Sequence, residues 1–289
     1  MRAAFFGLAL TILALGVAAT ATGGSSTQTA IPGCAKGNLT LLEEGTLTIG
    51  TDNPSFPPFY GGTAKKPWKI SYPYSGKGYE SAVAYAVAKE LGFAKRQVVW
   101  TPLVWTASFR PGKKPFDIYF SQISYSPERA KNAAFSNSYL FLNQSLVANA
   151  GTPLASVKTV AELRSYKLGV TIGTTAYDYV NRWVRPSQKP NVYDSQADAV
   201  SALNAKQIDG IVVDFPSALY VTAVQLDDGV IVGKLPTRGP REHFGIVLPK
   251  DSPNLRCVNR AVNRLWANGT IKKLQKTWLA ASAPDLRWR

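Results

Sequence analysis

Apolar and polar positions follow one another along this chain in a way that predicts strands alternating with helices. In the first half, short apolar runs predict strands at Leu47–Thr51, Val98–Thr101 and Asp117–Phe120. Between the first two runs, Val83, Val87 and Leu91 fall on one stripe of a helix, and Gly92 would end it. The alternation of strands with helices indicates an α/β architecture.

The same pattern restarts near Ser145. Thr159 and Glu162 match a capping box, in which a hydroxyl and a carboxylate satisfy free N–H groups at a helix start. Further strands are predicted at Lys167–Val170, Ile208–Val213 and Gly245–Pro249, with helices at Ala176–Val184 and Ala197–Asn204. Two amphipathic helices close the chain, the first ending at Gly269 and the second beginning at Thr270.

The first 21 residues have the pattern of an export signal. A charged start at Arg2 precedes an apolar run from Ala3 to Ala21 that ends in small residues, which predicts a signal peptide over residues 1–21. An uncleaved membrane anchor is the alternative, because the run is near the shortest membrane span of about 17 residues. In either case the rest of the chain is expected in the periplasm or at the cell surface, and residues 22–44 are predicted to be an N-terminal linker.

The chain is strongly basic, since 33 Lys and Arg against 18 Asp and Glu give a net charge of +15. Such a balance is typical of proteins that bind nucleic acids or anionic surfaces. Here the basic residues are scattered, as at Lys65-Lys66 and Lys272-Lys273, and no aromatic residues interleave with them to form a patch. We therefore expect a solvated basic surface and no nucleic-acid partner.

Two cysteines are present, Cys34 near the expected mature start and Cys257 near the end. In an oxidising compartment outside the cytoplasm, two cysteines allow one intramolecular pairing. A Cys34–Cys257 disulfide is predicted, and two unpaired thiols with Cys257 buried are the alternative.

The segment Asp117–Tyr139, DIYFSQISYSPERAKNAAFSNSY, carries the most information. An apolar strand leads into hydroxyls such as Ser121 and Ser124, and a Pro-Glu-Arg turn and a Phe-Ser-Asn-Ser-Tyr segment follow. These residues resemble the D…T-x-E-R…F-S-x-x-Y signature of the polar amino-acid-binding proteins of ABC importers, the family that includes the glutamine-binding protein. The resemblance extends from Gly45 to about Leu279.

The resemblance implies the two-lobed periplasmic-binding-protein fold of type II. In this α/β fold each lobe is a mixed sheet flanked by helices, and two hinge strands join the lobes. By matching the family pattern, lobe one is expected to hold residues 45–139 and 245–289, and lobe two residues 144–239. The hinges are expected near residues 139–143 and 240–244.

The resemblance also assigns residues to the two charged groups of a free amino acid. Arg129 matches the clamp for the ligand carboxylate, which suits the planar donor fork of a guanidinium; a surface salt bridge is the alternative. Thr174 and Thr175 stand at an expected helix N-terminus, where free N–H groups favour an anion. Asp214 matches the residue that accepts the ligand ammonium, and its alternative role is to cap the following helix.

The remaining positions shape the pocket around those charges. Ser124 aligns with a threonine whose hydroxyl meets the ammonium, and Gln122 stands where a family glycine offers its carbonyl. The positions where the family stacks rings on the ligand are here Phe56, Phe59 and Trp105. Thr171 occupies the place of a basic side-chain reader found in some relatives, so its neutrality favours a polar or neutral ligand over a dianion.

The implied function is to bind an amino acid outside the cytoplasmic membrane by closure of the lobes and to deliver it to the permease of an ABC importer. No G-x-x-x-x-G-K-[ST] loop is present, so ATP would be hydrolysed by another protein. We expect a monomer without a cofactor or a metal. The alternatives are a solute-sensing ectodomain and an enzyme of the same fold, such as a dehydratase, in which Glu128 and Asp214 would be the acid–base pair. His243 is the single histidine, which argues against a zinc site or a Ser-His-Asp triad.

Overall fold

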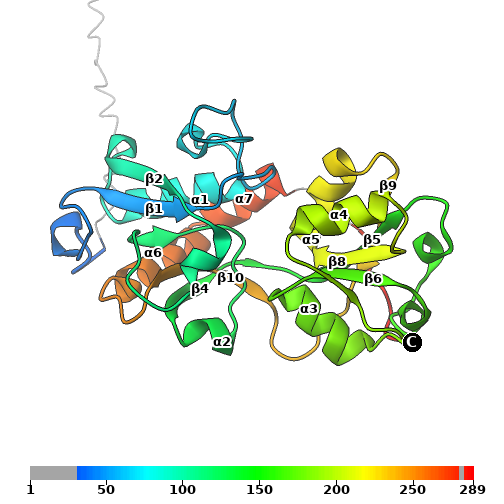
Figure 1. Cartoon of the computed structure of the whole chain (residues 1–289). Coiled ribbons are helices and arrows are strands. Elements are labelled where there is room, and N and C mark those ends of the chain that lie inside the picture. The colour runs from blue at the N-terminus through cyan, green and yellow to red at the C-terminus, as the bar shows by residue number, and fades with distance from the viewer. Residues whose placement is uncertain (1–30, 280–282) are drawn as a thin grey trace, which may run out of the picture.

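The structure is a computed structural model that describes residues 31–279 and 283–289. The predicted signal peptide and residues 22–30 of the predicted linker lie outside these ranges. Two lobes lie side by side, and each is built around a five-stranded sheet (Figure 1). Within the described ranges, no helix is long and apolar enough to cross a membrane.

The first lobe contains a mixed sheet with the strand order β2-β1-β3-β10-β4. Its strands are β1 (Leu47–Thr51), β2 (Val98–Pro102), β3 (Ile118–Tyr119), β4 (Ala133–Phe141) and β10 (His243–Pro249). β1 runs parallel to β2 and β3, whereas β10 runs antiparallel to β3 and β4. Both faces of this sheet are covered, which explains why its central strands read as nearly continuous apolar runs.

The second lobe repeats this arrangement with the strand order β7-β6-β8-β5-β9. Its strands are β5 (Gln144–Asn149), β6 (Leu168–Thr171), β7 (Asn191–Tyr193), β8 (Gly210–Asp214) and β9 (Gly229–Lys234). β6 runs parallel to β7 and β8, and β5 runs antiparallel to β8 and β9. The predicted fold class, two mixed sheets flanked by helices, is therefore confirmed.

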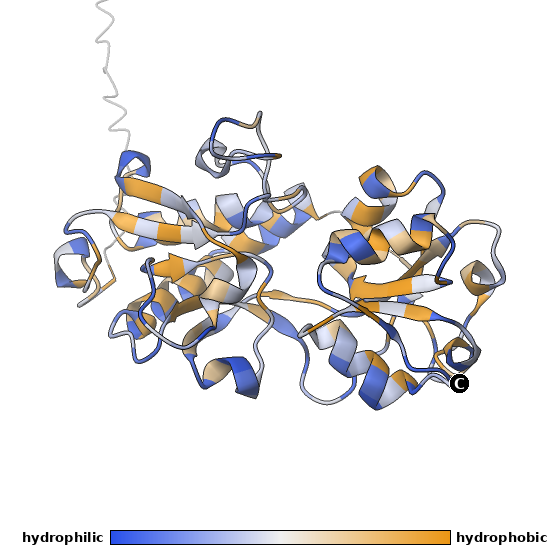
Figure 2. Ribbon diagram, viewed as in Figure 1, coloured by the Kyte–Doolittle hydropathy of each residue, from blue (hydrophilic) through white to orange (hydrophobic). Residues whose placement is uncertain are grey.

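Helices cover both sheets and bury their apolar stripes against them. The first lobe has α1 (Tyr79–Glu90), α2 (Pro127–Ala130), α6 (Leu255–Ala267) and α7 (Thr270–Trp278). The second has α3 (Thr175–Tyr179), α4 (Gln196–Asn204) and α5 (Phe215–Tyr220), and π-helical turns continue α3 and α5. In α6 the buried residues Val258, Val262 and Leu265 form the predicted stripe. Figure 2 shows the hydrophobic residues gathered on the strands of both sheets.

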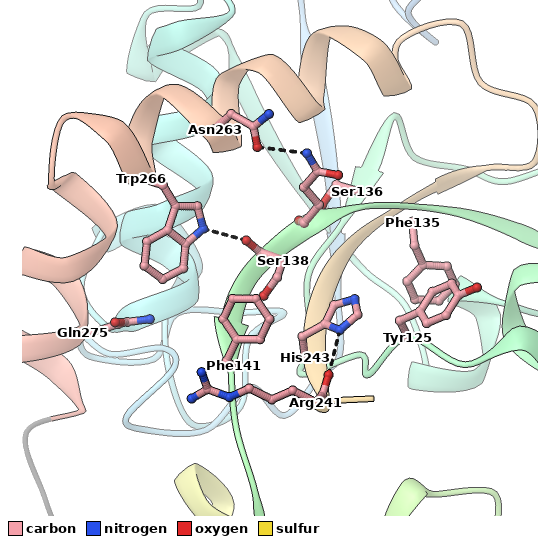
Figure 3. A pocket seen from close by; sticks show the side chains of 11 residues that line it. Tyr125, Phe135, Ser136, Ser138, Phe141, Arg241, His243, Asn263, Trp266 and Gln275 are labelled. Carbon is pink, nitrogen blue, oxygen red and sulfur yellow. Dashed lines mark hydrogen bonds between the residues drawn. The ribbon is translucent and has the colours of Figure 1, made fainter. Parts of the chain in front are cut away.

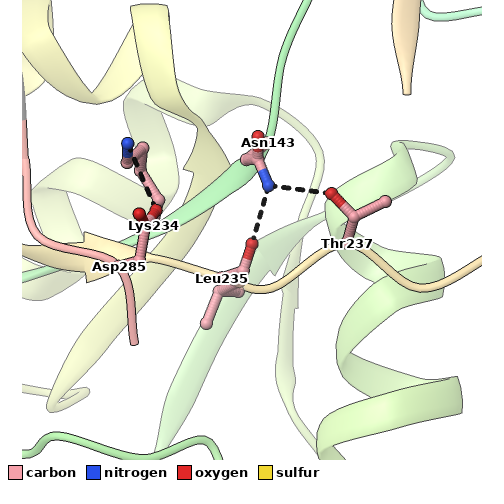
Figure 4. A network of polar contacts seen from close by, with 5 residues as sticks. All are labelled: Asn143, Lys234, Leu235, Thr237 and Asp285. Atoms are coloured by element: carbon pink, nitrogen blue, oxygen red, sulfur yellow. Dashed lines mark hydrogen bonds and ion pairs between the residues drawn. The ribbon is translucent and has the colours of Figure 1, made fainter. Parts of the chain in front are cut away.

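The chain passes between the lobes at Leu142–Asn143, between β4 and β5, and at residues 235–242, between β9 and β10. These crossing segments are bonded to each other. The Asn143 side-chain amide donates to the Leu235 carbonyl at 3.1 Å and to the Thr237 hydroxyl at 3.0 Å (Figure 4).

Residues 31–44 pack against the first lobe instead of forming a free linker. Ile31 and Cys34 are buried in its core, and Asn254 exchanges two hydrogen bonds with the backbone of Thr40. The predicted disulfide between Cys34 and Cys257 is confirmed, with Cα atoms 5.4 Å apart. It ties this segment to α6.

Residues 283–289 lie against the second lobe, whereas the prediction placed them in lobe one. The backbone N–H of Leu286 donates to the Lys234 carbonyl and that of Lys234 to the Pro284 carbonyl, both at 2.8 Å, so the segment runs along β9. An ion pair joins Lys234 to Asp285 at 3.2 Å (Figure 4). Leu286 is the physical reason, because this apolar side chain is 4% exposed in the core of the second lobe.

Two local predictions also need correction. The third strand covers only Ile118–Tyr119, shorter than the expected Asp117–Phe120, although the N–H groups of Asp117 and Phe120 still donate to the Thr48 and Gly50 carbonyls of β1. The Asp117 carboxylate also accepts backbone hydrogen bonds from Leu42 and Thr48. The capping box at Thr159 does not begin an α-helix. Glu162 accepts hydrogen bonds from the N–H and the hydroxyl of Thr159, and only a 3₁₀ turn follows.

Candidate functional site

A cavity of about 650 Å³ lies between the lobes, and side chains from both lobes line it. It opens at the carboxyl ends of parallel strands, where open α/β sheets place their ligands. Asp52 directly follows β1, Thr171 ends β6 and Asp214 ends β8. All ten predicted ligand-binding residues line it: Phe56, Phe59, Trp105, Gln122, Ser124, Arg129, Thr171, Thr174, Thr175 and Asp214.

Arg129 enters the cavity from α2 in the first lobe. Ser126 caps this short helix by accepting a hydrogen bond from the Arg129 N–H at 3.2 Å, which fixes where the side chain begins. The guanidinium lies over the rings of Trp105 and Phe109, with 4.8 and 5.0 Å to the ring centroids. The aromatic faces hold the cation in place while only 7% of the residue is exposed.

The Arg129 guanidinium is charged and partly available. It donates to the Ser124 carbonyl at 2.6 Å and, across the lobes, to the Gly173 carbonyl at 2.9 Å. These bonds use two of the five N–H groups that a guanidinium offers. Burial lowers the pKa of Arg129 to about 10, which leaves it protonated at neutral pH. The alternative of a surface salt bridge is wrong for the described residues, because their ion pairs do not include Arg129.

Asp214 caps a helix and also lines the cavity. Its carboxylate caps α5 by accepting from the Ser217 N–H at 2.9 Å and from the Ser217 hydroxyl at 2.8 Å. Each carboxylate oxygen has two acceptor sites, so capping leaves capacity for another donor. Burial raises the pKa of Asp214 to about 6, because the desolvated charge is only partly compensated. This carboxylate can therefore gain from a cation placed in the cavity.

The turn before α3 is held by its own hydroxyls. The Thr174 hydroxyl accepts from the Tyr177 N–H at 3.1 Å as the helix cap and donates to the Thr171 carbonyl at 2.7 Å. The Thr175 hydroxyl accepts from the Gln144 amide at 3.1 Å and donates to Glu242. The predicted turn is present, and both hydroxyls are bonded within the protein.

The backbone conformation at Gln122 explains why the family has a glycine at this position. Its φ of 51° lies in the left-handed region, which glycine adopts most easily. The Gln122 N–H donates to the Glu80 carboxylate at 2.7 Å, its side-chain amide donates to the other carboxylate oxygen, and Tyr139 donates its hydroxyl to the same carboxylate. Burial raises the pKa of Glu80 to about 7. The bulky Gln122 side chain is therefore anchored to the first lobe.

The aromatic residues have different surroundings. Trp105 donates its indole N–H to the Ser121 carbonyl at 3.0 Å, which orients the ring beside Arg129. Phe56 faces Tyr220 of the second lobe with ring centroids 5.4 Å apart, so this pair closes one side of the cavity. Phe59 is 2% exposed and packs in the core of the first lobe while also reaching the cavity.

The sequence reasoning missed Glu242, which lies in the second crossing segment. Its carboxylate accepts from the Ser124 hydroxyl at 2.6 Å, the Gln144 amide at 2.9 Å and the Thr175 hydroxyl. Ser124 belongs to the first lobe, whereas Gln144 and Thr175 belong to the second. The only sequence signal was an acidic residue within a segment expected to be a hinge.

Asp52 was missed as well. It lines the cavity at the end of β1, in the same relation to its strand as Asp214 to β8, and this position was the signal available. Burial raises the pKa of Asp52, while the N–H groups of Asn53 and Trp105 and the charge of Lys69 oppose the shift.

A second hollow, of about 790 Å³, lies behind the hinge between β4, β10 and α6. Its walls are aromatic and polar, with Tyr125 stacked on His243 at 5.6 Å and Trp266 donating to the Ser138 carbonyl at 2.7 Å (Figure 3). No Asp or Glu side chain is among the described residues that line it, so it has no carboxylate for an ammonium. The cavity between the lobes is therefore the better match for a zwitterion. No cluster of His, Cys, Asp or Glu suited to a metal ion occurs in the described part of the chain.

Comparisons with known proteins agree with this geometry. The family model of the bacterial extracellular solute-binding proteins, family 3, matches residues 47–281. The L-cystine-binding protein TcyJ of Escherichia coli K12 is 28% identical over 248 residues, which cover 83% of this chain and 85% of that protein.

Solved structures show similar folds. An ancestral arginine-binding protein bound to glutamine aligns with a TM-score of 0.64 and 27% identity, covering 83% of this chain and 100% of that one. An ancestral amino acid-binding protein, described as a precursor of cyclohexadienyl dehydratase, aligns with a TM-score of 0.63 and 27% identity, covering 81% of this chain and 95% of that one.

Proposed function

Because this chain belongs to family 3 of the bacterial extracellular solute-binding proteins, we propose that it binds a free amino acid outside the cytoplasmic membrane and delivers it to an ABC importer. The family consists of binding proteins, so the chain is not an enzyme. One observation carries the proposal. A single cavity has a buried cation, Arg129, on its first-lobe side and a desolvated carboxylate, Asp214, on its second-lobe side. This pair is complementary to a carboxylate and an ammonium that share one carbon of a ligand.

The ligand carboxylate docks first on Arg129, because that side chain is held by the first lobe and its remaining N–H groups suit two oxygens. Ser124 and the Gln122 carbonyl flank the ammonium. Closure then brings the second lobe over the ligand, with Asp214 on the ammonium and the Thr174–Thr175 turn on the carboxylate. Phe56, Phe59 and Trp105 exclude water, which strengthens both charge interactions. Closure is favoured only if the ligand contacts the closed form better than the open one.

The side chain of the ligand is proposed to be polar or neutral. Thr171 presents no charge to it, and the aromatic walls can cover aliphatic atoms. Relatives are named for cystine, arginine and glutamine, which have neutral or cationic side chains. Asp52, which the sequence reasoning missed, lines the same cavity and would also accept a cationic side chain.

The proposed partner is the membrane permease of the importer, and the proposed location is the periplasm or the cell surface. We propose that the protein acts as a monomer and contacts no nucleic acid. A solute sensor would use the same cavity with another partner. Uptake of labelled amino acid into vesicles that carry the permease distinguishes the roles, because only an importer component makes uptake depend on this protein.

Titration calorimetry of the mature protein against L-cystine and the twenty common L-amino acids tests the binding step. We expect micromolar or tighter binding of at least one neutral or cationic amino acid, equivalent to about −8 kcal/mol or better. The absence of heat with every ligand, together with no shift in the unfolding temperature, would contradict the proposed function.

A further inference from the structure

Glu242 is a carboxylate that neutral groups surround on both sides of the cleft. Its three donors are two hydroxyls and one amide, from Ser124, Thr175 and Gln144. Such donors fix a carboxylate in place but do not cancel its charge. The ion pairs found in the described ranges do not involve Glu242. A fixed carboxylate held by neutral donors therefore lies at the junction of the two lobes, and the cation it acts on is Arg129 of the cavity wall.

This charge acts on the two residues proposed to hold the ligand head group. It opposes the lowering of the Arg129 pKa and contributes to the raised pKa of Asp214. Two of its donors, Ser124 and Thr175, themselves line the cavity, so Glu242 stands directly behind the cavity wall. Its field therefore extends to wherever an amino-acid head group would sit.

A count of the charges around the cavity indicates which class of ligand is disfavoured. The head group of an amino acid would pair its carboxylate with Arg129 and its ammonium with Asp214. Two acidic residues then remain, Asp52 in the lining, on which Lys69 acts from outside it, and Glu242 behind Ser124 and Thr175. A second carboxylate on the ligand would meet both, and the described cavity lining holds no second cation for it. A neutral or cationic side chain meets no such repulsion.

We propose that Glu242 is a specificity-determining residue that rejects amino acids with an acidic side chain. This inference rests on the proposed function, because it concerns the ligand class of the same cavity. The neutral side chain of Thr171 permits a neutral or cationic ligand but does not exclude an acidic one. The inference assigns that exclusion to Glu242. Glu242 also orients the hydroxyls of Ser124 and Thr175, and its negative charge repels ligands with an acidic side chain from the cavity that these residues line.

The test uses two ligands of nearly equal shape, L-glutamine and L-glutamate, with the wild-type protein and Glu242→Gln. Glutamine at this position keeps the side-chain volume and one oxygen to accept from Ser124 and Thr175, while the charge is removed. A structural role would change the affinity for both ligands equally, so the readout is the ratio of the two dissociation constants. Binding is measured by calorimetry and by the ligand-dependent shift of the unfolding midpoint at millimolar ligand.

We expect the wild type to bind glutamine at least about tenfold more tightly than glutamate, a difference of ~1.4 kcal/mol. In Glu242→Gln this ratio should fall by at least about tenfold. Glu128→Gln is the matched control, because its carboxylate lies beside Arg129 in sequence but is 79% exposed and bonded to Lys131. That variant should keep the wild-type ratio.

Each outcome decides the question. Equal wild-type affinity for glutamine and glutamate would overturn the inference, whether or not Glu242→Gln folds. A ratio that Glu242→Gln leaves unchanged would overturn it as well, while leaving the proposed function intact. If neither L-cystine nor any of the twenty common L-amino acids binds the wild type, the proposed function fails and the inference fails with it.

Discussion

Arg129 is the residue on which the proposed carboxylate site depends most. Replacing it by alanine removes the buried cation and leaves a ligand carboxylate unpaired in a desolvated cavity. We expect Arg129→Ala to weaken amino-acid binding by about 2–5 kcal/mol, or roughly 30-fold to several thousand-fold. Calorimetry on the ligand found in the panel measures this. Arg182→Ala removes an exposed arginine of the second lobe and serves as the control. A loss below threefold for Arg129→Ala would exclude this residue from the site.

Asp214 predicts how binding depends on pH. Burial raises its pKa from 3.8 to about 6, and a protonated carboxyl no longer attracts an ammonium by charge. The affinity should therefore be flat above about pH 7 and fall by up to about tenfold per pH unit below 6. Calorimetry between about pH 5 and pH 8 gives the profile. An affinity that stays constant through pH 6 would contradict the assignment.

The same shift affects stability with the opposite sign. Because the pKa is higher in the folded state, the folded protein binds more protons than the unfolded chain between pH 3.8 and about 6. This carboxyl therefore favours folding more as the pH falls through that window. Asp214→Asn separates the two roles, since asparagine still caps a helix. The variant should fold normally, bind weakly and lose the pH dependence.

At the residue scale, the sequence predicted the site residues that belong to a local motif. It missed those that only the fold brings together. Arg129 lies in a recognisable Ser-Pro-Glu-Arg motif and Asp214 ends a predicted strand, and both line the cavity. Glu242 is 118 residues from Ser124 and 98 from Gln144, so nothing local connects them. The hydrogen bond between Gln122 and Glu80 could not be predicted either, because in the sequence Glu80 is an ordinary polar residue of a helix.

At the scale of elements, the C-terminal segment makes a distinct prediction. Leu286 is 4% exposed in the core of the second lobe, although the preceding helix α7 belongs to the first. Truncating it should leave a cavity there, and we expect Leu286→Ala to lower the free energy of unfolding by about 2–5 kcal/mol. Urea denaturation followed by circular dichroism measures the change. Val192→Ala, at a residue 45% exposed on β7, should cost far less. Equal effects of the two would show that the segment does not contribute to the core.

Elements whose apolar residues recur at a regular spacing were predicted well. Short strands that depend on pairing with distant strands were not. β1 matches its expected range because apolar spacing defines it, and α6 ends two residues before the predicted stop at Gly269. β7 is short, and β4 mixes polar with apolar residues. β9 is a short apolar run without alternation, and the pairing of all three with distant strands decides their structure. The segment 283–289 has neither period nor motif, so its position along β9 could not be predicted. It follows from the buried Leu286 and from backbone bonds and an ion pair with Lys234.

At the scale of the whole molecule, several contacts beside the cavity join the two lobes. The bond from Arg129 to the Gly173 carbonyl, the Phe56–Tyr220 pair and the donors to Glu242 join the two sides. Local periodicity shows that strands and helices restart after Ser145, but it cannot show that residues 243–278 return to the first sheet. The family resemblance supplied that topology.

The central claim is that the cavity binds a zwitterionic head group, and derivatives of the ligand test it directly. We would measure by calorimetry the affinity for the amino acid that binds best, for its α-carboxamide and for its N-acetyl form. The carboxamide removes the charge expected at Arg129, and the N-acetyl group removes the charge expected at Asp214. We predict that each derivative binds at least about 100-fold more weakly, a cost of ~2.7 kcal/mol or more. Affinities within threefold of the parent amino acid for either derivative would contradict the account.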